Sequence, residues 1–132
     1  MSYLLDTHTL LWAIQETEKL SSKVIELLES PQSTVVASVI NYWEICIKVE
    51  RAKLQLQGFL PEDVPDLVQR MGFFSVELSP SDASTFHNLR LNHHRDPFDR
   101  MLIWQALNND LTLITSDSSI QKYQEIGLKT LW

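Results

Sequence analysis

The sequence predicts an α/β fold of three layers (α/β/α), in which helices cover both faces of a mainly parallel sheet of four or five strands. Short apolar runs typical of strands alternate along the chain with stretches whose apolar residues recur at helical spacing. The chain has 132 residues, 44% of them hydrophobic, with only three glycines and five prolines. This composition fits a single domain over residues 1–132 and excludes a disordered or fibrous protein.

The chain is expected to open with one strand and two helices. Residues 3–5 form an apolar run that ends in Asp6, and apolar residues then recur at helical spacing over 7–15. A second helical pattern follows Ser21, whose side chain suits a helix cap, and Pro31 ends that pattern. The first strand therefore leads directly into a helix, as in other α/β proteins.

A largely buried helix is expected behind the second strand, which covers 34–37. Ser38 can cap this helix, which runs to about Arg51 and carries apolar residues over more than half of its circumference. We expect Trp43 and Cys46 to lie in the core. Because Cys46 is the only cysteine, a disulfide framework and a multi-cysteine zinc site are both excluded.

The second half of the chain continues the alternation of strands and helices. Pro97 suits the first position of a helix that runs to Asn108, and Gly127 suits the end of a helix over 118–126. The sequence also predicts helices over 61–71 and 81–89, and strands over 73–78, 111–115 and, at one edge of the sheet, 129–131. Strands joined through helices make right-handed crossovers, and the sheet is therefore expected to be mainly parallel.

Acidic residues fall at the strand ends, where an open α/β sheet binds its ligands. Asp6 follows the first strand, Asp117 lies just beyond the fourth, and Asp99 lies in the first turn of a helix. Glu44 lies on a narrow polar strip of its helix and can point to the same edge. Four carboxylates in one cleft repel one another, and a divalent cation removes that conflict. Such hard oxygen ligands favour Mg²⁺ or Mn²⁺.

Each of these acids also has a purely structural explanation. Asp6 and Asp117 can cap the helices that follow them, and the same role is favoured for Asp96 before Pro97. Glu44 can form an exposed pair with Lys48 one helical turn later. Capping alone does not readily explain four acids on one edge of the sheet.

The charge balance limits how this chain can bind a polyanion. It has 17 acidic residues against 11 lysines and arginines, a net charge of −6, so overall positive potential cannot hold nucleic acid. A local basic rim could do so, although the same residues could equally form a solvated surface. The main candidates for this rim are Lys48, Arg51, Arg95 and Arg100, with Lys53, Arg90, His93 and His94 nearby.

A cytoplasmic location is expected from two absences in the sequence. No stretch approaches the ~18 consecutive apolar residues of a membrane span. The first residues carry no basic segment before their apolar run, as an export signal would.

Four segments, in their order and spacing, resemble the PIN-domain ribonucleases of the VapC toxin type. They are residues 3–12, the helix containing Glu44, residues 94–103 and residues 113–117. The most specific element is the segment around Asp96-Pro97-Phe98-Asp99-Arg100, followed by Gln105-Ala106. The resemblance implies a metal-dependent endoribonuclease that is the toxin of a toxin–antitoxin pair. It also implies a homodimer and a cognate antitoxin whose C-terminal segment covers the acidic cleft.

The resemblance also assigns roles to individual residues. The family's acidic, catalytic and metal-binding positions map onto Asp6, Glu44, Asp99 and Asp117. We expect the first three to hold the principal Mg²⁺ or Mn²⁺ ion and Asp117 to complete its second side. The accessory candidates are Thr7, Asp96 and Thr115. Many relatives carry an Asn and an Asp-Phe pair after the last acidic strand, which this chain lacks; whether Asp117 binds metal directly or through water therefore stays open.

Two other functions are compatible with the same residues. An aspartate after the first strand also suits a phosphatase or phosphoryl-transfer domain that forms a covalent phosphoaspartate. No second Asp stands at Asp-x-Asp spacing after Asp6, which disfavours that activity. The second alternative is a binding module whose acidic cleft docks a basic partner peptide without catalysis.

Overall fold

The structure, a computed structural model that describes residues 1–132, confirms the α/β class and shows an entirely parallel sheet. The five strands stand in the order β3-β2-β1-β4-β5. Leu4 at the centre of the sheet pairs with Val36 on one side and Leu113 on the other. The strand bounds are β1 (Ser2–Leu5), β2 (Thr34–Ser38), β3 (Phe74–Val76), β4 (Thr112–Ile114) and β5 (Lys129–Leu131).

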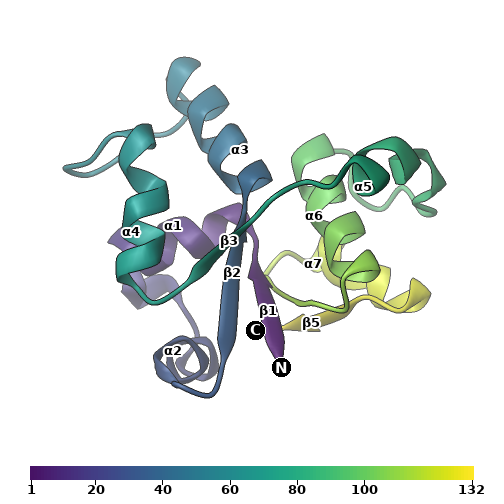
Figure 1. The fold of residues 1–132 in the computed structure, drawn as a ribbon, viewed down its shortest axis with the longest axis horizontal. Coiled ribbons are helices and arrows are strands. Elements are labelled where there is room, and N and C mark those ends of the chain that lie inside the picture. Colours follow the sequence, from purple (N-terminus) through teal and green to yellow (C-terminus); the bar gives the residue numbers. More distant parts are fainter.

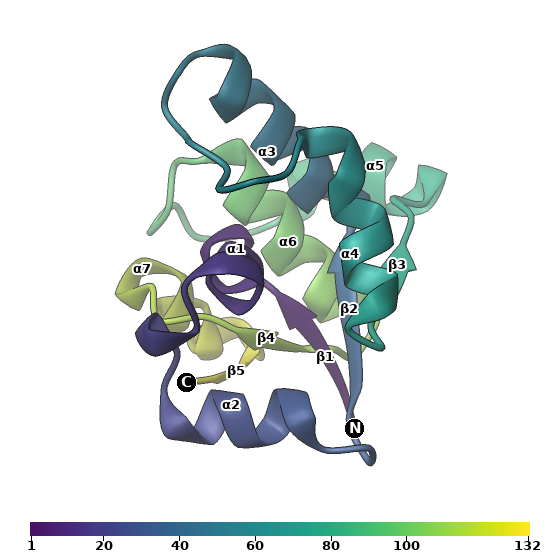
Figure 2. The same ribbon diagram turned by 90° about the vertical axis from the view of Figure 1, so that its left-hand side faces the viewer.

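Seven α-helices surround the sheet in the three layers that the sequence predicts. In Figure 1, α1, α2 and α4 lie on one side of the sheet and α5, α6 and α7 on the other, with α3 rising from the upper end of β2. Figure 2 views the first group from its outer side. None of the helices is long and apolar enough to cross a membrane. Their bounds are α1 (Thr7–Gln15), α2 (Ser22–Glu29), α3 (Val39–Glu50), α4 (Val64–Arg70), α5 (Pro80–Thr85), α6 (Pro97–Asn108) and α7 (Ser118–Gln121).

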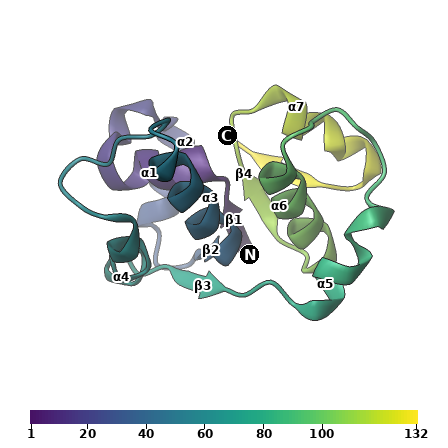
Figure 3. The same ribbon diagram turned by 90° about the horizontal axis from the view of Figure 1, so that it is seen from above.

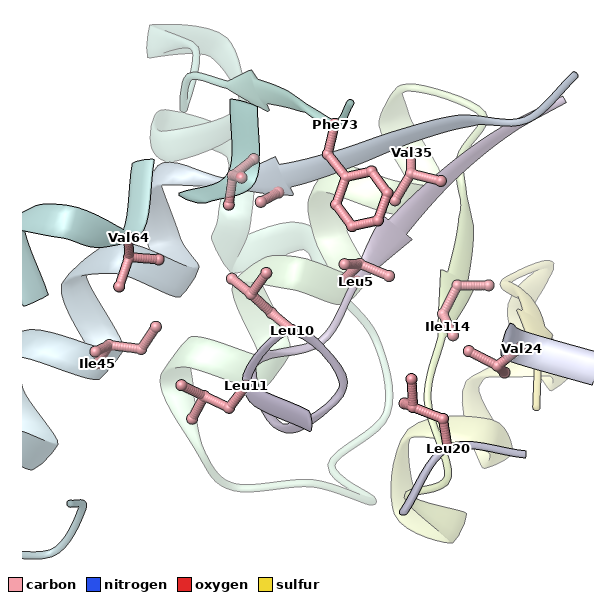
Figure 4. Close-up of a cluster of buried hydrophobic side chains, with 12 residues drawn as sticks. Leu5, Leu10, Leu11, Leu20, Val24, Val35, Ile45, Val64, Phe73 and Ile114 are labelled. Carbon is pink, nitrogen blue, oxygen red and sulfur yellow. The ribbon is translucent and has the colours of Figure 1, made fainter. Parts of the chain in front are cut away.

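Two apolar cores form because successive residues of a strand point to opposite faces of the sheet. Leu5 and Ile114 belong to the core beneath α1, α2 and α4, which Figure 4 shows in close-up. Leu4 and Leu113, their neighbours on the same strands, belong to the core beneath α6 and α7. Burial on both faces explains why these strands read as continuous apolar runs.

Several predicted elements are shorter in the structure than the sequence suggests. The predicted helix over 61–71 begins as a 3₁₀ turn at Pro61–Asp63, and the one over 81–89 ends as a 3₁₀ turn at Phe86–Asn88. The helix over 118–126 likewise tightens into a 3₁₀ helix at Lys122–Ile126. The i→i+3 hydrogen bonds of such turns satisfy backbone groups at helix ends, and a periodic apolar pattern does not distinguish them from α-helix.

The prediction that α3 is mostly buried is wrong for its outward face. Trp43 is 60% exposed and Cys46 is exposed, whereas Glu44 and Ile45 between them are buried. The helix extends beyond the sheet edge from which it starts (Figure 1), and its outward side is only partly covered. One partial cover comes from Phe98, whose ring meets the Trp43 ring edge-on at 5.2 Å between centroids. An apolar arc on the helix thus did not guarantee a partner for each residue in it.

Candidate metal centre

Helix caps bring three aspartates to the carboxyl edge of the sheet. Asp6 caps α1 by accepting the Thr9 N–H at 2.8 Å, and Asp117 caps α7 by accepting the Ser119 N–H at 2.7 Å. Asp96 caps α6 in the same way, as the sequence predicts. Each cap uses Oδ1. Capping and participation in a site are therefore compatible, because Oδ2 of each residue can have another partner.

Glu44 reaches the same edge from α3, which contacts α6; the two helices are neighbours in the view of Figure 3. Its side chain is 2% exposed and that of Lys48 is 31% exposed, so the pair with Lys48 is partly buried and not fully exposed as expected. The Lys48 ammonium donates to Oε2 at 2.5 Å, and the Thr7 hydroxyl donates to Oε1 at 2.6 Å. Glu44 is therefore held from both sides, with a cation already beside it.

Asn41 forms a buried junction between β1, α1 and α3 that sequence reasoning did not identify. Its Oδ1 accepts the Ser38 N–H at 2.7 Å, and its Nδ2 donates to the Leu5 carbonyl at 3.2 Å and the Thr7 hydroxyl at 3.0 Å. The local signal was its place three residues after Ser38, where a polar side chain can complete a capping box. The contacts to Leu5 and Thr7 depend on tertiary packing.

Replacing Asn41 by alanine is expected to lower the free energy of unfolding by about 2 to 4 kcal/mol, because three buried hydrogen bonds are lost and their partners stay buried. Urea unfolding would measure the change. The matched control is Asn92→Ala at an exposed position. A loss below about 0.5 kcal/mol for Asn41→Ala, the range of ordinary surface substitutions, would contradict this role.

The tightest group of potential metal ligands consists of His94, Asp99 and Asp117. One ligand atom from each lies within 4.8 Å of the others. The His94 Nε2 atom is 3.0 Å from the Asp99 Oδ2 atom and 3.1 Å from the Asp117 Oδ2 atom. Sequence analysis assigned His94 only to a basic rim. Its position two residues before the Asp96 cap was the available signal, but the approach of Asp117 could not be read from it.

The pKa of Asp99 reflects the negative charge of the other three predicted acids. Burial and, after it, the negative charges of Glu44, Asp96, Asp6 and Asp117 together raise this pKa from its usual value of 3.8 to about 8. Burial also raises the pKa of Asp6, although hydrogen bonds from Thr115 and Thr9 oppose the increase. Asp99 therefore lies among the other predicted acids, while Asp6 and Glu44 lie outside the tight group around His94.

Lys48 offsets only part of this negative charge. Burial tends to lower the pKa of its ammonium, but the hydrogen bond and charge of Glu44, together with Asp96 and Asp99, raise it overall. The protonated ammonium occupies one side of the cleft and shows that a cation is favoured there. The donor set of four carboxylates, one of which has its pKa raised by burial and by its neighbours, fits a hard divalent cation such as Mg²⁺ or Mn²⁺.

The three accessory candidates contact the acids and hold them in place. Thr7 donates to Glu44, and the Thr115 hydroxyl accepts the Asp117 N–H at 3.0 Å while also bonding to Asp6. Asp96 caps α6 through its carboxylate and donates its backbone N–H to His94 Nδ1. These contacts give all three a supporting role in the site.

The predicted basic rim divides into two groups in the structure. Arg51 and Arg95 are exposed and lie near the ends of α3 and α6. Arg100, in contrast, is half-buried and donates to the Leu91 carbonyl at 2.7 Å and the Tyr123 hydroxyl at 2.9 Å. Its guanidinium fastens the loop before α6 to the C-terminal segment, so Arg100 is not available to a ligand in this arrangement.

The fold and the site together define a three-layer α/β protein with an acidic cluster at the carboxyl edge of a parallel sheet. The family model described as PIN domain matches residues 3–126, which is nearly the whole chain. The chain therefore belongs to the PIN domain family, as the sequence resemblance implied.

Two known proteins are similar to this chain over almost its whole length. Ribonuclease VapC22 of Mycobacterium tuberculosis is 26% identical to this chain over 129 residues, covering 98% of this chain and 97% of that protein. The crystal structure of VapBC2 from Rickettsia felis, bound to a DNA fragment from their promoter, contains a chain with a TM-score of 0.70 and 17% identity. That match covers 99% of this chain and 98% of the other, and it shows a shared fold.

Proposed function

We propose that this protein is a metal-dependent endoribonuclease and the toxin of a toxin–antitoxin pair. The observation that carries the proposal is the convergence of Asp6, Glu44 and Asp117 on Asp99, whose pKa rises to about 8 through burial and the negative charges around it. The likeness to a ribonuclease over almost the full length of both chains supports the reaction. The likeness to VapC-type toxins over most of the sequence supports the biological role.

The side chains of the cleft have distinct tasks in this proposal. Asp99 and Asp117 would hold the ion directly, because their oxygens approach within 4.8 Å, and Asp6 and Glu44 would complete its surroundings. When bound, Mg²⁺ or Mn²⁺ lowers the pKa of water and neutralises charge on the scissile phosphate. Thr7 fixes the orientation of Glu44, and Thr115 fixes that of Asp6. Lys48, Arg51 and Arg95 would contact neighbouring phosphates of the RNA.

The acidic cleft also suits a protein partner. We propose that a cognate antitoxin inserts a basic side chain that pairs with the carboxylates, as Lys48 already does with Glu44. The proposed assembly contains two copies of this chain and is located in the cytoplasm. A covalent phosphoaspartate at Asp6 is disfavoured further by the structure, since this residue is only 4% exposed and its Oδ1 caps α1.

RNA cleavage by the purified chain is expected to require Mg²⁺ or Mn²⁺ and to stop when EDTA removes the metal, because the carboxylates alone cannot neutralise the phosphate. Gel analysis of a mixed RNA pool would measure this, and re-addition of Mn²⁺ after EDTA is the control for damage to the protein. Metal binding without any cleavage would favour the peptide-docking alternative. Equal cleavage with and without EDTA would contradict the proposed mechanism.

A further inference from the structure

We infer that His94 is a positioning residue that holds Asp117 beside Asp99 through a protonated Nε2, and that it does not bind the metal ion itself. This inference rests on the metal site of the proposed function. The three side chains come from separate segments: His94 from the loop before α6, Asp99 from α6 and Asp117 from the turn after β4. Their proximity alone would suggest one ion held by all three, but the second ring nitrogen of His94 indicates a different arrangement.

The tautomer of His94 follows from its contact with Asp96. The backbone N–H of Asp96 donates to His94 Nδ1 at 3.1 Å, and a ring nitrogen that accepts a hydrogen bond carries no proton. The single proton of the neutral ring is then on Nε2, which lies 3.1 Å from Asp117 Oδ2 and 3.0 Å from Asp99 Oδ2. A nitrogen that carries a proton has no free electron pair for a metal ion.

Asp96 fixes the orientation of the His94 ring and the start of α6 through its backbone N–H and its carboxylate, respectively. Its carboxylate caps α6 while its N–H orients the His94 ring, so the start of the helix sets both the position of Asp99 and the direction of Nε2. The ring is also well covered, with a side-chain exposure of 15%. His94 is therefore placed to draw the Asp117 carboxylate, which is 36% exposed, toward Asp99, which is 13% exposed. The carboxylate oxygens of Asp99 and Asp117 are then close enough together to bind one divalent ion.

The first test reads the tautomer directly. Nitrogen-15 NMR of the whole protein is expected to show His94 with an unprotonated Nδ1 and a protonated Nε2, both without metal and with saturating Mg²⁺. The His94→Gln spectrum assigns the signal among the four histidines. A protonated Nδ1, or loss of the Nε2 proton when Mg²⁺ is added, would overturn the inference.

The second test separates a donor from a ligand by Mn²⁺ titration, monitored by electron paramagnetic resonance. His94→Ala is expected to weaken Mn²⁺ binding by about 10- to 100-fold, as is typical for groups that orient metal ligands. His94→Gln should restore most of this loss, because its amide can donate from the position of Nε2. The control His93→Gln changes a neighbour that lies 3.7 Å from Glu125 and should bind Mn²⁺ normally.

The outcomes distinguish this inference from the proposed function. Equal weakening in His94→Gln and His94→Ala, or no weakening in either, would overturn the positioning role. If the wild-type protein binds neither Mn²⁺ nor Mg²⁺, the proposed function fails, and the tautomer measured without metal still decides which ring nitrogen of His94 carries the proton.

Discussion

Asp99→Asn is expected to reduce RNA cleavage by at least about 10² to 10³-fold, the usual effect of removing one group that stabilises the transition state electrostatically. The negative charges of four other carboxylates raise the pKa of Asp99, so this residue lies within the electrostatic reach of the whole acidic group. An amide at this position keeps the shape of the side chain but loses the charge that would hold a cation. A cleavage assay at saturating Mn²⁺ would measure the loss.

The same substitution is expected to stabilise the protein in the absence of metal. Burial and the neighbouring charges disfavour the ionised Asp99, and a neutral amide removes that cost. Thermal unfolding in EDTA should therefore give a higher melting temperature for the variant than for the wild type. The matched control is Asp66→Asn, because Asp66 is exposed on α4 and pairs only with Arg70.

Asp6→Asn provides an independent check on the acidic cleft, because Asp6 lies outside the tight group around His94. It too is expected to abolish cleavage while the protein remains folded. Full cleavage by both Asp6→Asn and Asp99→Asn would contradict the assignment of the site.

The metal-free protein is expected to lose stability as the pH rises from about 4 to about 8. The folded state holds the Asp99 proton up to a pKa of about 8, whereas the unfolded chain releases it near 3.8. Folding therefore binds a proton throughout this interval, and the free energy of unfolding falls by on the order of 1 kcal/mol per pH unit and then levels off. The raised pKa of Asp6 changes stability in the same direction.

Urea unfolding between pH 5 and pH 9, at about one-unit steps, would measure this dependence on proton binding. Mg²⁺ should flatten the slope, because a bound cation favours the ionised carboxylates, and Asp99→Asn should remove most of it. An increase in the free energy of unfolding across this interval, or an unchanged slope in Asp99→Asn, would show that proton binding by Asp99 does not cause the pH dependence.

The parts of this structure that the sequence could predict are governed by local signals. The strands are continuous apolar runs, and Asp6, Asp96 and Asp117 stand directly before helices, so both the sheet and the three caps could be inferred. The position of Glu44 followed from helical periodicity. Because parallel strands end at one edge, these local assignments were enough to gather the acids.

The features that could not be predicted depend on contacts between distant segments. The exposure of Trp43 and Cys46 depends on which elements cover α3, and an apolar pattern does not say whether a neighbour is present. The contact between His94 and Asp117 joins residues 23 positions apart, through a loop whose path has no regular pattern. Arg100 looked available for RNA, but its partners Leu91 and Tyr123 are set by the same loop.

The aspartates that begin α1, α6 and α7 have a consequence for mutagenesis of this edge. Asparagine accepts the same backbone N–H groups as aspartate, whereas alanine leaves them unsatisfied and costs about 1 kcal/mol at each helix start. An alanine scan would therefore mix damage to folding with damage to chemistry at Asp6, Asp96 and Asp117. The asparagine variant at each position would measure the effect of losing the negative charge. The further loss in the alanine variant would measure the effect of losing the helix cap.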